Sequence, residues 1–150
     1  MKGIDNIGLK SLARDLGIES SIEELGRLSY SATLQRTLEC DVLLVLDPPS
    51  TDSLILTCKF VDYVQTGRPI LVVSSRMGAS NDIISSNGGG IIVDCNSLEA
   101  ITSALEELYA HWQNNTLDNL YSSDRLYRLF SPEVILAKYL EIFEKIGVRL

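Results

Sequence analysis

Uninterrupted hydrophobic runs and helically spaced hydrophobic residues alternate along this chain. The run at 70–73 is β-branched and aliphatic throughout, which predicts a strand that is buried on both faces of a parallel sheet. Two further runs predict strands, at 41–47 and 91–94, and a shorter pattern predicts one at 21–25. Apolar residues at helical spacing predict helices between them, at 9–16, 29–39, 57–66, 81–86, 97–112 and, as the final helix, about 132–147.

Capping signals set the expected ends of these helices. Ser29 is placed to cap the helix that follows it, and Gly67 is placed to end a helix in the left-handed conformation. Asn96 and Glu99 match a capping box for the helix at 97–112. Large apolar residues are expected on the buried faces of two helices: Leu34 and Leu38 in one, and Leu98, Ile101, Leu105 and Leu108 in the other.

Helices between successive strands imply right-handed crossovers, so the predicted fold class is α/β, a Rossmann-like parallel sheet with flanking helices. The polar segment 114–128 is expected to be irregular. Sheets of this kind bind ligands beyond the carboxyl ends of their strands. Here those ends lead into the segments 26–29, 47–56, 74–80 and 94–96.

Composition narrows the possible functions. The chain has 150 residues, a typical length for one domain, and a net charge of −7, which argues against broad binding to nucleic acid or anionic lipid. No secretory signal is visible, and no run approaches the roughly 20 apolar residues that span a bilayer. Three separated cysteines and a single histidine form no disulfide or metal-ligand pattern. We therefore expect a cytoplasmic protein without a bound metal or cofactor.

The loop after Asp47 and the helix start near Thr57 form the first candidate site. A helix start offers free amides and a partial charge of about +0.5, which suits a diphosphate. Ser53 and Thr57 add hydroxyl groups, Lys59 adds a positive charge, and Asp62 is placed to accept hydrogen bonds from ribose hydroxyls. The spacing of Lys59 and Asp62 is also that of an ordinary surface ion pair worth about 0.2–0.5 kcal/mol, and spacing alone leaves both readings open.

Three other features are weaker candidates. The segment 74–80 places small residues and Arg76 at a strand end, where sugar hydroxyls or a phosphate could be held, although many such loops look alike. The glycine run 88–90 precedes a strand instead of following one, so it predicts a turn and not a dinucleotide-binding fingerprint. Cys58 lies near a helix start with no histidine in its segment, so an inert thiol is expected.

Several segments follow one another in a recognisable order. Leu16-Gly17 is followed by Gly26-Arg-Leu-Ser-Tyr30 and by Leu38-Glu-Cys-Asp-Val-Leu-Leu-Val45. Lys59-Phe-Val-Asp-Tyr-Val-Gln-Thr-Gly-Arg-Pro-Ile-Leu71 comes next, and Gly88-Gly-Gly-Ile-Ile-Val-Asp94 with Asn96-Ser-Leu-Glu99 closes the series. This ordered set, from about residue 9 to 110, resembles the donor-site region of GT-B glycosyltransferases of the family-four type.

The resemblance implies a domain that binds a nucleotide-diphosphate sugar, the C-terminal half of a two-domain enzyme that transfers the sugar to an acceptor with retention. It implies that Asp62 holds the ribose, that residues 50–57 offer amides to the diphosphate, and that Gly26 and Arg27 lie against the base. The first acid of the family's pair falls on Leu54, which cannot make that contact. Enzymes of this type need no metal.

Roles for the remaining candidates follow from the same resemblance. Ser53 and Thr57 would contact the diphosphate, and Lys59 would be the catalytic residue, because its charge stabilises the leaving diphosphate. The alternative is a non-enzymatic interaction module, flavodoxin-like or response-regulator-like, in which Asp47 imitates part of an acidic cluster.

The resemblance also implies partners. The first strands of the donor domain and the whole acceptor-binding domain would precede the segments found here, so the chain would be a truncated C-terminal half that is inactive alone. Membrane association could then come through the missing N-terminal domain. An unpaired sheet edge and the apolar stripe of the final helix would favour a homodimer of the fragment or a rearranged sheet.

Overall fold

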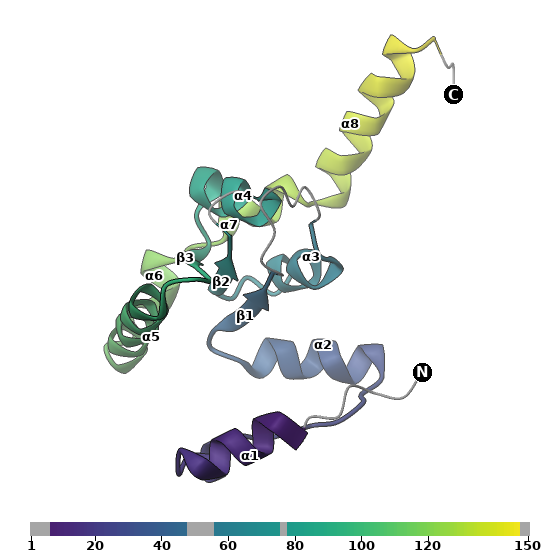
Figure 1. Ribbon diagram of the computed structural model, residues 1–150. Helices are drawn as coiled ribbons and strands as arrows, with labels where there is room; N and C mark the ends of the chain where they lie inside the picture. Colours follow the sequence, from purple (N-terminus) through teal and green to yellow (C-terminus); the bar gives the residue numbers. More distant parts are fainter. Residues whose placement is uncertain (1–6, 48–55, 76–77, 148–150) are drawn as a thin grey trace. The chain divides into compact units, whose positions relative to one another are not determined.

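The computed structural model describes residues 7–47, 56–75 and 78–147 of the chain (Figure 1). The chain divides into two compact units, Met1–Thr33 and Leu34–Leu150. All three described strands belong to the second unit. The fold class is therefore decided by the second unit.

The first unit contains helix α1 (Ile7–Asp15), the 3-10 turn η1 (Glu19–Ser21) and the start of α2 (Tyr30–Glu39). Ser29 caps α2 as predicted, because its hydroxyl accepts a hydrogen bond of 3.3 Å from the amide of Ala32. These elements match the helices predicted at 9–16 and 29–39.

The strand predicted at 21–25 is wrong. Ser21 ends η1, and Ile22 has an extended backbone (φ −116°, ψ 119°), but none of the strands in the described ranges pairs with this segment. A short apolar alternation can favour an extended backbone locally, whereas a strand also needs a neighbour that completes its hydrogen-bond ladder.

Within the described residues the sheet has three parallel strands: β1 (Leu43–Leu46), β2 (Ile70–Ser74) and β3 (Gly90–Asp94), in the order β1-β2-β3. Helix α3 (Cys58–Val64) connects β1 to β2, and α4 (Ala79–Asn87) connects β2 to β3. Every residue of β2 is buried, as its unbroken apolar run predicts. The predicted α/β class and Rossmann-like parallel sheet are confirmed.

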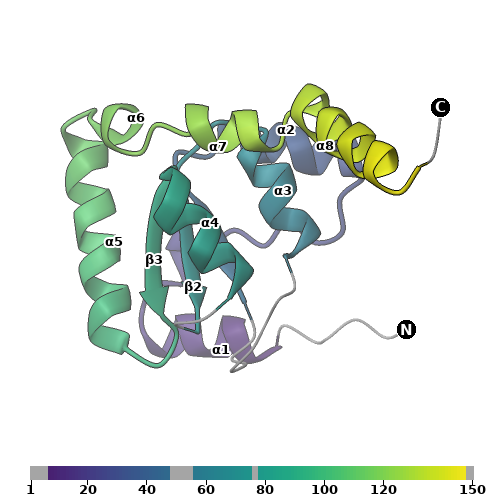
Figure 2. The same ribbon diagram turned by 90° about the horizontal axis from the view of Figure 1, so that it is seen from above.

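Helices lie against both faces of this sheet (Figure 2), and apolar side chains pack on each face. One face is covered by α3, whose Phe60 and Val64 are fully buried at the predicted helical spacing. The other face is covered by α5 (Leu98–Gln113), which contributes Ala104 and Leu108. Because both faces are covered, ligands can approach the strands only at their ends or along an edge strand.

The start of α5 differs from the predicted capping box. Ser97 is the N-cap, and its hydroxyl accepts a hydrogen bond of 3.1 Å from the amide of Ala100. Asn96 instead donates through its backbone amide to Oδ1 of Asp94, at 2.9 Å. The predicted cap was therefore one residue too early, because Asn96 belongs to the turn that leaves β3.

Helix faces also differ from the prediction in two places. Leu98 and Leu105 of α5 are 78% and 52% exposed, whereas the small Ala104 is buried. In α2, Leu38 is 52% exposed while Thr37 is buried. Side-chain size alone does not decide which face of a helix is buried. A small residue such as Ala104 lets the helix approach the sheet closely, and the larger side chains next to it then lie beside the contact.

The segment after α5, predicted to be irregular, contains helices α6 (Leu117–Leu120) and α7 (Asp124–Leu129). Leu126 is fully buried in the core that α3 covers. The hydroxyl of Ser123 donates to the backbone carbonyl of Gly67 at 2.9 Å, which attaches the segment to the turn before β2. This return segment completes the core.

Tyr121 joins the return segment to α5. Its hydroxyl donates a hydrogen bond to the carboxylate of Glu107, and its ring lies against His111 with centroids 6.0 Å apart. Burial of the phenol and, after it, the hydrogen bond to Glu107 raise the pKa of Tyr121. The neutral phenol is therefore the form that the folded structure favours.

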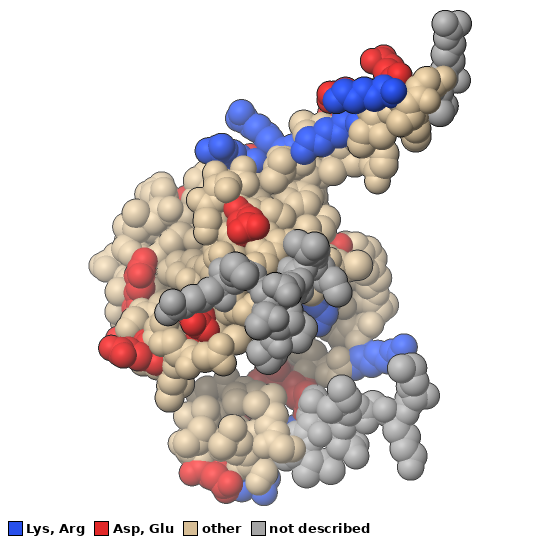
Figure 3. Space-filling view, turned by 45° about the horizontal axis from the view of Figure 1, so that its top comes forward, with Lys and Arg blue, Asp and Glu red and all other residues tan. Residues whose placement is uncertain are grey.

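Helix α8 (Pro132–Lys145) begins at its proline as predicted, and Ser131 caps it by accepting from the amide of Val134 at 3.3 Å. Its apolar side chains are not packed away: Leu136 and Tyr139 are both more than half exposed. Basic and acidic side chains lie close together along it (Figure 3). None of the helices within the described ranges is long and apolar enough to cross a membrane.

Candidate functional site

The three strands end side by side at one edge of the sheet. The amide of Asp47, directly after β1, donates to the carbonyl of Val73 in β2 at 3.0 Å. The amide of Cys95, directly after β3, donates to the carbonyl of Ser74 at 2.8 Å. Three of the four predicted ligand-binding segments therefore start from neighbouring positions, where parallel α/β sheets bind ligands.

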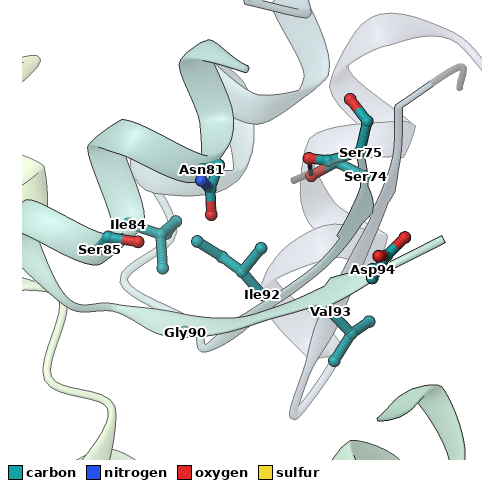
Figure 4. Close-up of a pocket in the computed structure, with 9 residues that line it drawn as sticks. All are labelled: Ser74, Ser75, Asn81, Ile84, Ser85, Gly90, Ile92, Val93 and Asp94. Atoms are coloured by element: carbon teal, nitrogen blue, oxygen red, sulfur yellow. Dashed lines mark hydrogen bonds between the residues drawn. The ribbon is translucent and has the colours of Figure 1, made fainter. Parts of the chain in front are cut away.

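A cavity of about 530 Å³ lies between α4 and β3 and extends along β3 from Gly90 to Asp94, at this edge (Figure 4). Its apolar side is formed by Ile84 of α4 and Ile92 of β3, whereas the side chain of Val93 points to the opposite face of the sheet. Its polar side is formed by groups from β2, α4 and β3: Ser74, Ser75, Asn81, Ser85 and Asp94. Its volume is within the range of about 300–1,000 Å³ that is usual for small-molecule sites.

Two polar groups of the cavity are fixed by the backbone around them. The hydroxyl of Ser74 donates to the carbonyl of Ser75 at 3.1 Å. The carboxylate of Asp94 accepts from the amide of Asn96 at 2.9 Å and from its side-chain nitrogen at 3.2 Å.

Two buried polar atoms near the strand ends have no hydrogen-bond partner in the described structure. They are Oδ1 of Asp47, which follows β1, and Oγ of Ser80, in the first turn of α4. Ser80 is only 1% exposed. A buried polar atom without a partner costs about 1–3 kcal/mol, so a ligand that satisfies these atoms would recover that free energy.

The start of α3 is formed as the sequence predicts. Thr57 has an extended backbone (φ −70°, ψ 142°), and its hydroxyl accepts from the amide of Phe60 at 3.4 Å. The acceptor capacity of this hydroxyl is partly used within the protein, but the hydroxyl can still donate. Lys59 is exposed and Asp62 is half-buried. Their roles in ligand binding stay predictions.

The other predicted site residues are distributed differently. Gly26 has the left-handed backbone of a turn (φ +65°), and both Gly26 and Arg27 are exposed residues of the first unit. Ser53, Leu54 and Arg76 lie outside the described residues. Contacts of Gly26, Arg27 and Ser53 with a ligand therefore stay predictions.

Ser74 and Ser75 of the cavity belong to the segment 74–80 that the sequence analysis names as a candidate, whereas Asn81 and Asp94 were missed as site residues. Asn81 was identified only as the start of a helix, and Asp94 only as the end of a strand. The adjacency of β2 and β3 was the signal that could have joined them, because it places residues after both strands at one edge. Within 7–47, 56–75 and 78–147, no three His, Cys, Asp or Glu side chains are grouped as metal ligands are.

Comparison with solved structures gives a likeness of fold. No protein-family model matches the sequence, and no curated protein matches it. The fold is similar to that of a sucrose-phosphate synthase from Thermosynechococcus elongatus, with a TM-score of 0.68 over 92% of this chain and 13% sequence identity. The chain spans about a third (33%) of the length of that protein. At this identity the likeness establishes the shared fold.

Proposed function

We propose that this chain is the donor-binding part of a glycosyltransferase and that it binds a nucleotide-diphosphate sugar at the carboxyl edge of its sheet. The observation that carries the proposal is that the three described strands end side by side at one edge, where sheets of this kind bind ligands. The sequence resemblance to GT-B glycosyltransferases and the fold shared with a sucrose-phosphate synthase support it.

In the proposed complex, the diphosphate lies near the start of α3. Thr57 donates a hydrogen bond to it, and the exposed Lys59 supplies a positive charge. Charge builds up on the diphosphate as it leaves the sugar, so a fixed cation at that point stabilises the transition state more than the ground state. Lys59 therefore contributes to catalysis without a covalent step.

The nucleoside is recognised by a further group of the same unit. Asp62, one helical turn after Lys59, accepts hydrogen bonds from the ribose hydroxyls. Leu54 replaces the acid that related enzymes place near the sugar, so contacts to the sugar come from other residues. Transfer with retention to an acceptor would use the acceptor-binding domain that the sequence resemblance implies.

Calorimetric titration of the full chain with the diphosphates of uridine, guanosine and adenosine tests this proposal. At least one is expected to bind, and Asp62→Ala is expected to weaken its binding by about 10–150-fold, because a charge-assisted hydrogen bond is worth about 1.5–3 kcal/mol. Asp118→Ala removes the same charge from the exposed surface of α6 and serves as the control. Absence of binding by all three nucleotides would overturn the proposal, and equal binding by Asp62→Ala would overturn the role of Asp62.

Lys59 is tested in the same titration. Lys59→Ala is expected to weaken the binding of the nucleoside diphosphates and to leave the binding of the nucleoside without phosphate unchanged, because the lysine interacts with the phosphate charge. Lys138→Ala, an exposed lysine of α8, is the matched control. Equal losses for the diphosphate and for the nucleoside would contradict the assignment.

A further inference from the structure

The side of the sheet that α5 covers is left open at β1. Leu44 and Leu46 are 51% and 66% exposed, and they alternate with Leu43 and Val45, which are buried. Successive side chains of a strand point to opposite faces, and Val45 belongs to the core under α3, so Leu44 and Leu46 point to the α5 side. Parallel sheets of this kind normally have both faces covered. Strand β1 therefore presents an apolar surface beside α5.

Helix α5 continues this apolar surface. Leu105, Tyr109 and Trp112 follow one another at helical spacing and are about half exposed, and the rings of Tyr109 and Trp112 stack with centroids 5.8 Å apart. All three line a cavity of about 480 Å³ together with residues 40–42, which lead into β1. We call the combined area the β1–α5 surface, and it consists of Leu44, Leu46, Leu105, Tyr109 and Trp112. A strand face bordered by a helix is the kind of surface on which a further helix packs in an α/β fold.

Helix α8 carries a matching apolar stripe. Among its described residues, Pro132–Lys145, none is buried. Ile135, Tyr139 and Ile142 follow at intervals of four and three residues, the intervals that also separate the three side chains of α5. Ile146, at the end of the helix, continues this α8 stripe. Two helices whose stripes have this spacing can pack side by side along their length.

The α8 helix of the same chain cannot cover the β1–α5 surface. Phe130, two positions before α8 begins, packs on Phe60 of α3 with ring centroids 6.1 Å apart. Leu126 is buried in the same core. Helix α8 therefore begins on the α3 side of the sheet, and the strands lie between it and α5 in both Figure 1 and Figure 2. An α8 helix that reaches the β1–α5 surface has to come from another molecule.

We propose that α8 of a second copy of this chain docks on the β1–α5 surface, and that the docking is reciprocal, so that two copies form a closed two-fold dimer. A half-exposed aromatic side chain loses about 100 Å² of accessible surface when it is covered, and a half-exposed leucine or isoleucine about 50 Å². The β1–α5 surface and the α8 stripe together then bury about 500–600 Å² at one site, which is below the roughly 1,000 Å² that a specific interface needs. Two reciprocal sites bury about 1,000–1,200 Å² and reach that area.

Three tyrosines provide matched variants, because Tyr139 of α8, Tyr109 of α5 and Tyr127 of α7 are all about half exposed. Sedimentation velocity of the full chain at rising concentration measures the dissociation constant. Tyr139→Asp and Tyr109→Asp are each expected to raise it by about tenfold or more, because each places a charge within an apolar contact. Tyr127→Asp, outside both surfaces, is expected to leave it unchanged. A chain that stays monomeric up to about 1 mM, or a dimer that neither Tyr139→Asp nor Tyr109→Asp weakens, would overturn the proposal.

Mixing the two defective variants tests whether the docking is reciprocal. In a mixture of Tyr139→Asp and Tyr109→Asp chains, the unaltered α8 of the second meets the unaltered β1–α5 surface of the first. One of the two sites is then intact, so the mixture is expected to associate more tightly than either variant alone. Pairing of α8 with α8, or of one β1 edge with another, would not be restored by mixing. Absence of this recovery would therefore overturn the reciprocal docking.

Two cysteines report where the second copy binds. Cys40 and Cys58 are both exposed; Cys40 lines the cavity of the β1–α5 surface, whereas Cys58 begins α3. Alkylation of Cys40 is expected to slow in proportion to the dimeric fraction as the chain is concentrated, while the alkylation rate of Cys58 stays constant. Dimerisation that leaves the rate at Cys40 unchanged, or slows both thiols equally, would overturn the assignment of this surface.

Discussion

Gly90 is a position at which even the methyl group of alanine would collide with the backbone of the neighbouring strand. It opens β3 opposite Ile70 of β2, and a Cβ atom built on it would lie 1.9 Å from the carbonyl oxygen of Ile70. The same Cβ would lie 2.8 Å from the carbonyl carbon. Both obstacles are backbone atoms of the central strand, which cannot move aside as the end of a side chain can. Gly90→Ala is therefore expected to force β2 and β3 apart.

The free-energy cost can be estimated from this geometry. Restoring even a tight contact of 3.0 Å requires a displacement of about 1.1 Å, while the adjacent hydrogen bond from the amide of Ile70 to the carbonyl of Gly89 is 3.0 Å long. That bond cannot survive such a displacement, and its loss costs about 1–3 kcal/mol. Overpacking adds about 1–3 kcal/mol, so the total is about 2–6 kcal/mol, a large share of the 5–15 kcal/mol of a typical domain.

Urea denaturation followed by circular dichroism measures this effect. Gly8→Ala is the matched control, because Gly8 lies in α1 and a Cβ there would meet nothing within 4 Å. Gly8→Ala is expected to be neutral or to stabilise by about 0.5–1 kcal/mol. A free energy of unfolding for Gly90→Ala within about 0.5 kcal/mol of the unsubstituted chain would refute the close approach of the two strands.

Two further predictions concern stability. Ser97→Ala is expected to lower the free energy of unfolding by about 1 kcal/mol, because it removes the cap of α5. Asn96→Ala is expected to lower it by less. A larger loss of stability for Asn96→Ala than for Ser97→Ala in urea denaturation would support the capping box at Asn96. The pKa of Tyr121 is raised in the folded state above its unfolded value of about 10, so the folded chain holds that proton more tightly. The stabilisation is present below about pH 10 and is lost as the pH rises above it. Tyr121→Phe should therefore flatten the decline of the free energy of unfolding above about pH 10, and equal slopes for both chains would contradict this.

The sequence is sufficient to predict the sheet because its signals are local. The run at 70–73 is apolar at every position, and this is the pattern of a strand that is buried on both faces. The buried face of α5, in contrast, cannot be predicted from local signals. Leu98 and Leu105 fit the expected helical spacing, but the sheet accepts the small Ala104, and this choice depends on how closely the helix approaches. Packing distance is a tertiary property that periodicity does not contain.

The return segment shows the same limit. Its polar composition gives no sign that Leu126 is buried, because that burial depends on packing against α3 and α4. The candidate site was predictable as an edge of the sheet, since carboxyl ends of parallel strands meet there. The identity of its residues was not, because Asn81 and Asp94 come together only through the pairing of β2 with β3.

The contact of the return segment with the turn before β2 also affects how the chain folds while it is being synthesised. Ser123 and Gly67 are 56 positions apart, and Leu126 fills a core whose other members come from 45–84. Contacts between distant positions slow folding, and a chain that emerges from the ribosome meets its partners in sequence order. The apolar side chains of α3 and α4 that pack on Leu126 therefore stay exposed, and accessible to chaperones, until α7 has been translated. A ribosome that pauses before residue 126 would prolong the exposure of this apolar surface, and exposed apolar surface favours aggregation.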